Sequence, residues 1–240
     1  MPTLETSLPP ADRLRLSDTV YNQLLGDIIG ARIAVGDRLA PETQLAERFA
    51  VSRPVVREAL QRLQSDGVVI SRQGSGSYVQ RSPSQQVGAL TRTFTLHDVL
   101  QSFELRMALE GLSASLAARN RSDVQMAAVE KTALALKTVF GKSKAAQEAD
   151  YAFHRAIAVA SGNLLLVETL DQLADRLKGG MNVSLSLSRQ ASVQRRDRVL
   201  DEHDRIVRAI KVQDEGSAAI AMQYHIDQAR NRLLDGQLDR

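Results

Sequence analysis

Helical periodicity from about Leu96 to the end of the chain constrains the fold more than any other feature. Apolar residues recur every three or four positions in a first long segment, at Leu100, Phe103, Leu105, Leu109, Leu112 and Leu116, which is the spacing of an amphipathic helix. Further helices are predicted near 122–140, 143–160, 163–178, 181–193, 195–213 and 217–235. Because no repeat of 20–50 residues is evident, this half of the chain predicts a compact all-α bundle.

Three of the four histidines of the protein, His154, His203 and His225, lie at positions in this helical half that helical geometry can bring together. Asp150 and His154 are four residues apart, so on one helix they share a face, about 6 Å apart along the axis. His203 lies eleven residues before Asp214, and His225 lies eleven residues after it. Because residues 214–216 interrupt two helical patterns, an antiparallel helix pair folded there places both imidazoles at one level of the bundle.

A carboxylate with three imidazoles is typical of a site for a borderline divalent ion. Zinc is the first choice, with nickel, cobalt or manganese as alternatives, and we expect one ion per chain with an open position for a ligand. Any one of these histidines, taken alone, is more often a residue of the core or surface. The joint register of four ligand-type residues, Asp150, His154, His203 and His225, favours the metal site.

The first eighty residues predict short helices followed by a β-hairpin. Residues 17–31 have helical spacing, with Ser17 or Asp18 as the N-cap. A short helix begins at Pro41, and Ser52 is positioned to cap a third helix that runs to Asp66. Two short helices joined by a tight turn indicate a helix-turn-helix.

The hairpin follows the third helix directly. Val68, Val69 and Ile70 form a β-prone run, residues 73–76 form a turn, and residues 77–79 return. A hairpin in this place is a wing. The polar segment 81–88 contains proline and glycine, as interdomain linkers do. We therefore predict a DNA-binding domain at 10–80, a linker at 81–95 and a helical effector domain at 96–236.

Arginine is the only cation of residues 1–81, which hold ten arginines against nine acids. Arginine is the side chain whose planar fork matches phosphates and guanine edges. Arg53 and Arg57 are four residues apart at the start of the third helix, the end that enters the major groove in helix-turn-helix proteins. The opposite face is apolar and predicted to lie in the core, through Val56, Ala59, Leu60 and Leu63.

Composition fits a water-soluble protein of two domains, with 43% hydrophobic and 25% charged residues among 240. The chain has no apolar run long enough to span a bilayer and no cysteine, so neither a membrane segment nor a disulfide framework is expected. Residues 1–10 lack the pattern of an export signal. A cytoplasmic location is expected.

Two stretches carry a resemblance to a known family. Residues 19–80 resemble the winged helix-turn-helix of the GntR superfamily of bacterial transcription regulators, through VSRPVVREALQRLQSDGVV at 51–69 and GSGSYV at 74–79. The remainder resembles the ligand-binding FCD domain of the FadR subfamily, through FELRMALEGLSASLAAR, DYAFHRAIAVASGN, EHDRIVRAI and AMQYHIDQA. The resemblance therefore covers nearly the whole chain.

The resemblance implies roles for particular residues. It assigns Asp150, His154, His203 and His225 as metal ligands, and it implies DNA contacts from Ser52, Arg53, Pro54, Val55 and Arg57, with Gln73 and Gly74 at the wing tip. It also implies that Arg106 binds the carboxylate of an effector and that Asn163 lines the same pocket. The chain departs from many relatives at Thr43, where they carry arginine, which puts a DNA contact there in doubt and predicts a different operator sequence.

These features predict a mainly α protein, with an N-terminal winged helix-turn-helix and a C-terminal all-α bundle. We expect a homodimeric transcription repressor, not an enzyme, that binds a palindromic double-stranded DNA operator. A small carboxylate such as a hydroxy acid, sugar acid or dicarboxylate would bind the metal and Arg106 together. Two alternatives stay open: a metal-dependent hydrolase, for which Glu202 is the one obvious general base, and a regulator with a purely structural metal.

Overall fold

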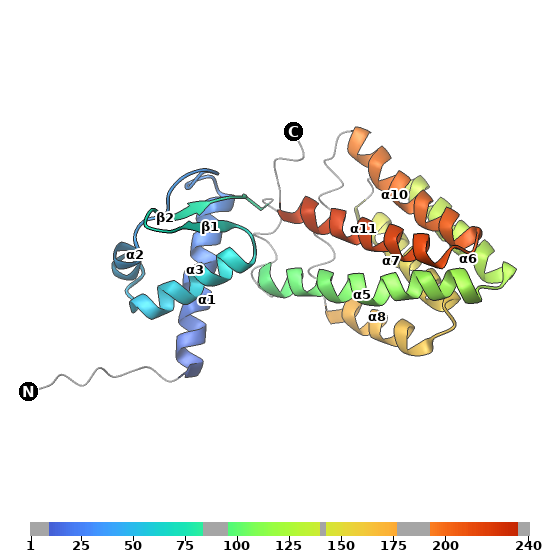
Figure 1. Ribbon diagram of the computed structural model, residues 1–240, viewed down its shortest axis with the longest axis horizontal. Coiled ribbons are helices and arrows are strands. Elements are labelled where there is room, and N and C mark those ends of the chain that lie inside the picture. The colour runs from blue at the N-terminus through green and yellow to red at the C-terminus, as the bar shows by residue number, and fades with distance from the viewer. Residues whose placement is uncertain (1–9, 84–95, 140–142, 177–192, 235–240) are drawn as a thin grey trace, which may run out of the picture. The chain divides into compact units, whose positions relative to one another are not determined.

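The computed structural model describes residues 10–83, 96–139, 143–176 and 193–234, and the chain divides into two compact units, residues 1–97 and 98–240 (Figure 1). The first unit holds helices and a two-stranded sheet, and the described part of the second is entirely helical. The predicted fold class is therefore confirmed. Within the described residues, no helix is long and apolar enough to cross a membrane.

The described part of the first unit contains three helices and a hairpin: α1 (Pro10–Ile29), α2 (Glu42–Phe49), α3 (Arg53–Ser65), β1 (Val69–Arg72) and β2 (Gly76–Val79). The predicted N-cap of the first helix is wrong, because α1 begins seven residues before Ser17. Ser17 is instead buried inside α1, and its hydroxyl donates a hydrogen bond to Glu58 of α3 over 3.0 Å. This contact joins the first helix to the third.

The wing is an antiparallel pair in which Val69 lies opposite Val79. The segment before α2 pairs with its outer edge, because the Leu39 amide donates to the Ser77 carbonyl over 2.8 Å. Gly76 is required here on two grounds. Its φ of 110° is one that other residues rarely adopt, and a Cβ there would lie 2.9 Å from Nε of Arg38.

The core of this unit lies between α1 and α3. The predicted apolar face of α3 is buried, and the α1 residues buried in the same unit are Val20, Tyr21, Leu24, Leu25 and Ile28. Asp27 of α1 is also buried and accepts hydrogen bonds from Arg48 of α2 over 2.5 Å and from Arg32 over 2.6 Å. Burial raises the pKa of Asp27, but the two arginines outweigh it and hold the pKa below its usual value. This ion pair fixes α2 against α1.

The second unit is built from long helices: α5 (Leu96–Asn120), α6 (Asp123–Val139), α7 (Ser143–Ala160), α8 (Leu164–Arg176), α10 (Val193–Lys211) and α11 (Glu215–Leu234). The predicted helix at 181–193 falls almost wholly outside the described residues. Helix α6 packs against α7 and α10, and α10 packs against α11. The largest side chains buried here include Phe153, Ile157, Ile206 and Ile210.

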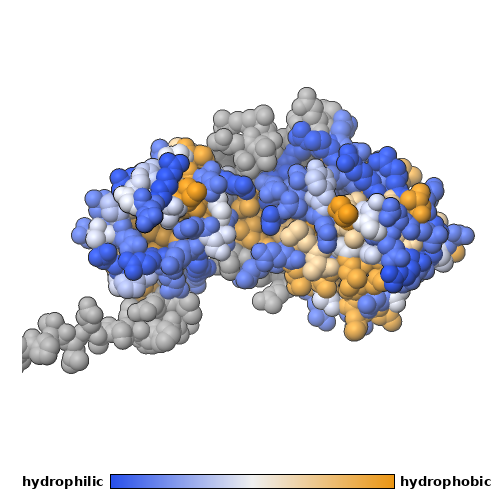
Figure 2. Space-filling view, viewed as in Figure 1, coloured by the Kyte–Doolittle hydropathy of each residue, from blue (hydrophilic) through white to orange (hydrophobic). Residues whose placement is uncertain are grey.

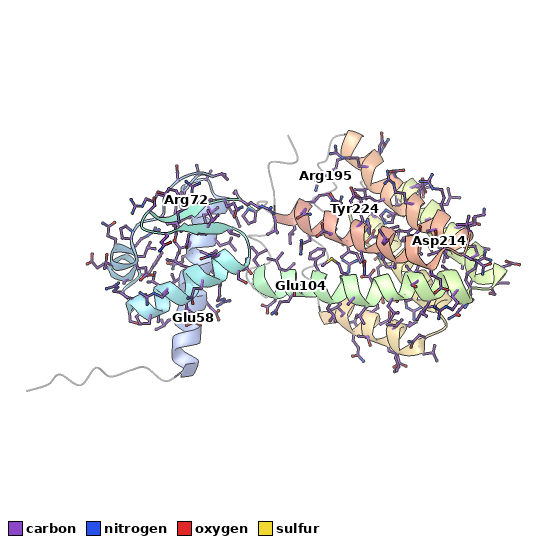
Figure 3. All side chains as sticks on the ribbon, viewed as in Figure 1. Glu58, Arg72, Glu104, Arg195, Asp214 and Tyr224 are labelled. Atoms are coloured by element: carbon purple, nitrogen blue, oxygen red, sulfur yellow. The ribbon has the colours of Figure 1, made fainter. Side chains whose placement is uncertain are left out.

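The turn between α10 and α11 sets the register of the two helices. Gln213 adopts a left-handed φ of 60°, and Asp214, labelled in Figure 3, caps α11 by accepting the Ser217 amide over 2.9 Å. Gly216 lies inside α11 rather than in the turn. The turn therefore lies just before Asp214, close enough to the predicted position to keep His203 and His225 at one level.

Candidate metal centre and nucleic-acid interface

Three helices bring together the four predicted metal ligands. Asp150 and His154 lie on α7, His203 on α10 and His225 on α11. All four are buried, and one ligand atom from each lies within 4.8 Å of the others. Phe153 packs edge-on against His203, with ring centroids 5.0 Å apart. The cluster therefore sits in the apolar interior of the bundle.

Each imidazole has an oxygen close to its Nδ1 atom, which forms a hydrogen bond in His203 and His225 and a close contact without hydrogen-bond geometry in His154. Nδ1 of His154 lies 2.5 Å from Oε2 of Glu110, Nδ1 of His203 lies 2.7 Å from the Val199 carbonyl, and Nδ1 of His225 lies 2.8 Å from Oε2 of Glu202. These contacts favour the tautomer with its proton on Nδ1, which leaves a lone pair on Nε2. Histidines that bind metals use the same arrangement, with a carboxylate or carbonyl behind the ring.

The donor atoms fit a divalent ion. Nε2 of His203 and Nε2 of His154 lie 3.2 and 3.8 Å from the two oxygens of Asp150. Donors that share an ion at about 2.1 Å lie roughly 3–3.5 Å apart, so little movement is needed. Nε2 of His154 is buried without a hydrogen-bond partner in the described part of the chain. A buried polar atom without a hydrogen-bond partner lowers the stability of the fold by about 1–3 kcal/mol. A cation bound at this point would interact with the lone pair of this nitrogen.

The electrostatics of the cluster favour a positive ion. Burial raises the pKa of Asp150, but the three imidazoles outweigh it and hold that pKa far below its usual range. Burial also raises the pKa of Glu110, but the charges of Arg106 and His154 outweigh this effect and lower the pKa to about 2. Burial and the neighbouring imidazoles lower the pKa of His225, which keeps that ring neutral. Burial lowers the pKa of His154, but the carboxylates of Glu110 and Asp150 outweigh it and raise that pKa, so an ion and a proton would compete for this ring.

Arg106 reaches the same cluster from α5. Its Nε donates a hydrogen bond to Oε1 of Glu110 over 2.5 Å, and its guanidinium lies 5.7 Å from the Phe103 ring. Its two terminal nitrogens make no hydrogen bond within the described residues. Burial lowers the pKa of Arg106, but the Glu110 carboxylate outweighs it and raises that pKa above its usual value. Arg106, Glu110 and His154 thus form a buried chain that ends at the metal cluster.

Asn163 has a structural role in this geometry. Its side-chain oxygen accepts the Leu165 amide over 3.1 Å at the start of α8, as an N-cap residue does. It lies nine residues beyond His154, most of them on α7, which corresponds to about 13 Å of helix. No contact between Asn163 and the metal cluster is recorded among the described residues.

The two arginines predicted to read DNA are exposed at the start of α3, and a single carboxylate holds both. Glu42 of α2 accepts hydrogen bonds from Nη2 and Nε of Arg57 over 2.8 and 3.1 Å, and Nη2 of Arg53 lies 3.8 Å away. The hydrogen bond from Arg57 is the main reason that the pKa of Glu42 is lowered. Glu42 thus orients the exposed face of the recognition helix.

Most of the other predicted DNA contacts lie on the surface. Ser52 and Pro54 are exposed at the start of α3, and Gln73 and Gly74 are exposed in the turn of the wing. Ser52 occupies the N-cap position, but its hydroxyl makes no capping hydrogen bond. Val55 differs, because it is only 1% exposed and packs in the core. Its side chain cannot reach DNA, so only its backbone is left for such a contact.

Several residues of these sites were not found by sequence reasoning. Glu110 and Glu42 were not singled out, and Glu202 was considered only as a general base. The separation of four residues between Arg106 and Glu110 was a usable signal on one helix. The Glu202 contact with His225 crosses two helices, and no local pattern shows it.

Comparisons with known proteins match both halves of the chain to families. Residues 101–228 match the FCD domain family, and residues 16–79 match the family described as bacterial regulatory proteins, gntR family. The chain is 32% identical over 204 residues to the HTH-type transcriptional regulator LutR of Bacillus subtilis (strain 168), covering 82% of this chain and 92% of that protein.

Two further similarities have comparable coverage. The chain is 30% identical over 218 residues to the putative L-lactate dehydrogenase operon regulatory protein of Escherichia coli (strain K12), covering 88% of this chain and 84% of that protein. A solved structure of Streptococcus agalactiae GntR is 25% identical and covers 90% of this chain and 99% of that chain, with a TM-score of 0.47.

The metal cluster leads to a first prediction. His203→Ala removes one ligand and should reduce bound divalent metal, measured by elemental analysis, to a small fraction of the wild-type content. Glu110→Gln keeps all four ligands but changes the partner of His154, and should weaken metal affinity by about 10–100-fold. Acidification should release the ion, because the imidazoles must be neutral to coordinate.

The matched control is Asp204→Asn, next to His203, whose carboxylate pairs with Lys137 over 2.7 Å instead of facing the cluster. This variant should keep the wild-type metal content. Equal metal in His203→Ala and wild type would contradict the assignment.

Proposed function

Because the chain belongs to the gntR family of bacterial regulatory proteins and carries an FCD domain, it is a DNA-binding transcription regulator, and we propose that it is a repressor controlled by a small carboxylate bound at a metal-containing pocket. It is not an enzyme. The bound metal would act as a Lewis acid that accepts an oxygen of the effector in its open position. Regulation then follows if the effector has different affinities for two arrangements of the protein.

The buried chain of Arg106, Glu110 and His154 is the observation that carries the effector proposal. Among the residues that the structure describes, Arg106 is hydrogen-bonded through Nε alone, so its two terminal nitrogens are proposed to bind an incoming carboxylate. Guanidinium binds carboxylates in a two-pronged, charge-assisted geometry. A metal ion beside this guanidinium favours a carboxylate with a second oxygen donor, such as an α-hydroxyl group.

The Escherichia coli relative supports this class of ligand through its name, which refers to an L-lactate dehydrogenase operon. Lactate is an α-hydroxy carboxylate and offers the donor pair that the site would select. We therefore place hydroxy acids first among the candidate effectors, ahead of sugar acids and dicarboxylates.

DNA recognition is proposed to rest on α3 and the turn of the wing. Arg53 and Arg57 have the spacing and exposure to reach base edges or phosphates in the major groove. In the free protein Glu42 neutralises part of their charge. An arginine that binds a phosphate or a guanine must share or release the Glu42 carboxylate. Glu42 therefore influences the free energy of each contact with DNA. The exposed Thr43 follows it and supplies no cation.

A homodimer is proposed because a palindromic operator requires two recognition helices, and the second unit has an uncovered apolar surface. Leu105 and Leu112 of α5 are exposed at the spacing typical of helices that pack together. Leu164 and Leu165 of α8 are 74% and 71% exposed. Figure 2 shows hydrophobic surface gathered over the region where Figure 1 draws α8. Such patches mark interfaces more often than open surface.

The hydrolase alternative is not retained. Glu202, its one candidate general base, is held by His225 and by Arg232, whose Nη1 lies 2.8 Å from Oε1. A carboxylate used in this way orients an imidazole instead of serving as a free general base. The alternative of a purely structural metal predicts that no organic acid stabilises the protein, and the effector experiment below tests it.

The DNA interface predicts that Arg53→Ala weakens operator binding by roughly 1–3 kcal/mol and relaxes specificity at the base it reads. Quantitative footprinting at fixed salt measures both. The control is Gln61→Ala, an exposed position on α3 at the opposite end of the helix from Arg53, which should bind as wild type does. An unchanged footprint with Arg53→Ala would count against α3 as the reading helix.

The apolar surface predicts that Leu112→Glu shifts the protein from dimer to monomer, because a charge at a packed helix contact is costly to bury. Sedimentation equilibrium over a range of concentrations measures the association constant. Val124→Glu on α6 is the matched control, since Val124 is more exposed than Leu112 and lies on another helix. If both variants remain dimers, the interface lies elsewhere.

The effector pocket predicts that Arg106→Ala weakens binding of the effector by about 1.5–3 kcal/mol. A thermal-shift screen of hydroxy acids, sugar acids and dicarboxylates, with and without chelator, identifies the ligand. Calorimetry and a gel-shift assay then compare the variants. Glu104→Gln, an exposed change on the same helix, should leave the affinity unchanged.

DNA affinity without effector should change little in Arg106→Ala, because Arg106 lies outside the DNA-binding unit. Metal content is measured in parallel, since Glu110 loses its partner in this variant. A full response of Arg106→Ala at the wild-type effector concentration would remove the carboxylate role and leave only the metal. A screen in which no acid stabilises the wild type would favour the structural metal.

A further inference from the structure

A short segment before α2 adds a third strand to the wing. The Val79 amide donates a hydrogen bond to the Asp37 carbonyl over 2.9 Å, and Arg38 lies directly opposite Tyr78 in an antiparallel bridge. Because β2 also pairs with β1 along its other edge, β2 is the middle strand of the three. The wing therefore carries Arg38 on an outer strand, next to the hairpin that the sequence predicts.

The register of the three strands determines which residues share a face of this sheet. Alternate residues of one strand share a face, and so do residues directly opposite one another on neighbouring strands. By this rule one face consists of Arg38, Ile70, Arg72, Gly76 and Tyr78. The residues of the opposite face that pack in the core are Leu39, Val69 and Val79. The first set, which we name the outer wing face, is therefore turned toward solvent, and both of its arginines are exposed.

The two arginines of the outer wing face are positioned by the middle strand. The guanidinium carbon of Arg72, which Figure 3 labels on the hairpin, lies 4.8 Å from the centre of the Tyr78 ring. The Tyr78 hydroxyl in turn lies 2.6 Å from Oγ of Ser75 in the turn. Arg38 lies against Gly76, where a Cβ would be 2.9 Å from its Nε. The absence of a side chain at Gly76 thus gives room for the second guanidinium.

The outer wing face has two positive charges and no carboxylate among its five residues. Neither arginine side chain forms a hydrogen bond or an ion pair with another residue in the described part of the chain. This differs from Arg53 and Arg57 of α3, which both lie against Glu42. A phosphate group can therefore bind at the outer wing face without replacing a carboxylate of the protein.

We propose that Arg38 and Arg72 bind the phosphate backbone of DNA from the outer wing face. This inference deepens the DNA recognition proposed above and rests on it. Guanidinium groups match phosphate oxygens through paired, charge-assisted hydrogen bonds. The proposed wing-tip contacts, Gln73 and Gly74, follow Arg72 directly in the chain, so a wing that approaches DNA brings both arginines with it. Contacts of this kind fix the position of a protein on the duplex but carry no sequence information.

The test is the salt dependence of DNA binding by the full-length protein, measured by fluorescence anisotropy with two probes. One probe is a duplex that the wild-type protein selects from a random pool, and the other is a mixed-sequence duplex of the same length. Each phosphate contact contributes about 0.9 to the magnitude of the slope of log affinity against log salt. Arg38→Gln should therefore reduce that magnitude by about one, and Arg38→Gln/Arg72→Gln by about two, with both probes alike.

Two variants serve as controls. Arg38→Lys keeps the positive charge and should keep the wild-type slope. Arg32→Gln removes an exposed arginine of the same unit whose charge is paired with Asp27, and it should also keep the slope. The thermal unfolding midpoint of each variant is measured. If Arg38→Gln destabilises the third strand, Arg72→Gln alone repeats the test with that strand intact.

An unchanged slope in the double variant would overturn the proposal. A loss of affinity for the selected duplex alone would do so too, because phosphates are present in both probes. Arg53→Ala keeps failure of this inference distinct from failure of the recognition helix, since it should reduce the preference for the selected duplex, which the wing variants should leave unchanged. If only Arg53→Ala has its expected effect, the wing does not bind phosphate. If only the wing variants do, α3 is not the reading helix. Wild-type protein that bound neither probe would contradict both.

Discussion

The arrangement of the helical unit depends on the burial of three imidazoles and a carboxylate at one point. Groups of this kind are costly to remove from water unless each finds a partner. The helices meet that demand jointly, because α5 supplies Glu110, α7 supplies Asp150 and His154, and α10 and α11 supply the other two rings. A shift of any of these four helices would move at least one of these groups away from its neighbours in the cluster. The cluster therefore fixes the register of the bundle as well as its chemistry.

The DNA-binding unit solves a related problem on its surface. Its net charge is small, yet its arginines are positioned by carboxylates, with Asp27 holding α2 to α1 and Glu42 holding the two arginines of α3. Paired arginines lose less conformational freedom on binding than free ones, but they must exchange one partner for another. Specificity follows from this exchange, because only a well-placed phosphate or guanine replaces the carboxylate without loss.

Local spacing predicted much of this. The separation of four residues put Asp150 and His154 on one face, the symmetry about Asp214 put His203 and His225 at one level, and the apolar stripe of α3 identified its buried side. The predictions that were wrong concern residues whose position depends on contacts between elements that are distant in the sequence. Val55 lies at the edge of that stripe, and only the packing of α3 within the folded unit shows that it is buried.

The carboxylates behind the imidazoles were missed for the same reason. The helical period of a sequence shows which face of a helix a residue occupies, but it does not show which other helix packs against that face. The contact of Glu202 with His225 could therefore not be predicted. Ser17 likewise has the composition of a helix cap and lies in mid-helix, where its hydroxyl finds Glu58. In both cases a tertiary partner overrides the local preference.

Glu202 links the metal cluster to a second charged group. One of its oxygens lies 2.8 Å from Nδ1 of His225, and both of its oxygens are within hydrogen-bond reach of Arg232. A carboxylate behind a metal-binding imidazole orients the ring and makes it more basic, whereas a guanidinium that shares the carboxylate draws part of its charge away. The affinity of the cluster for an ion would therefore depend on Arg232 as well as on the four ligands themselves.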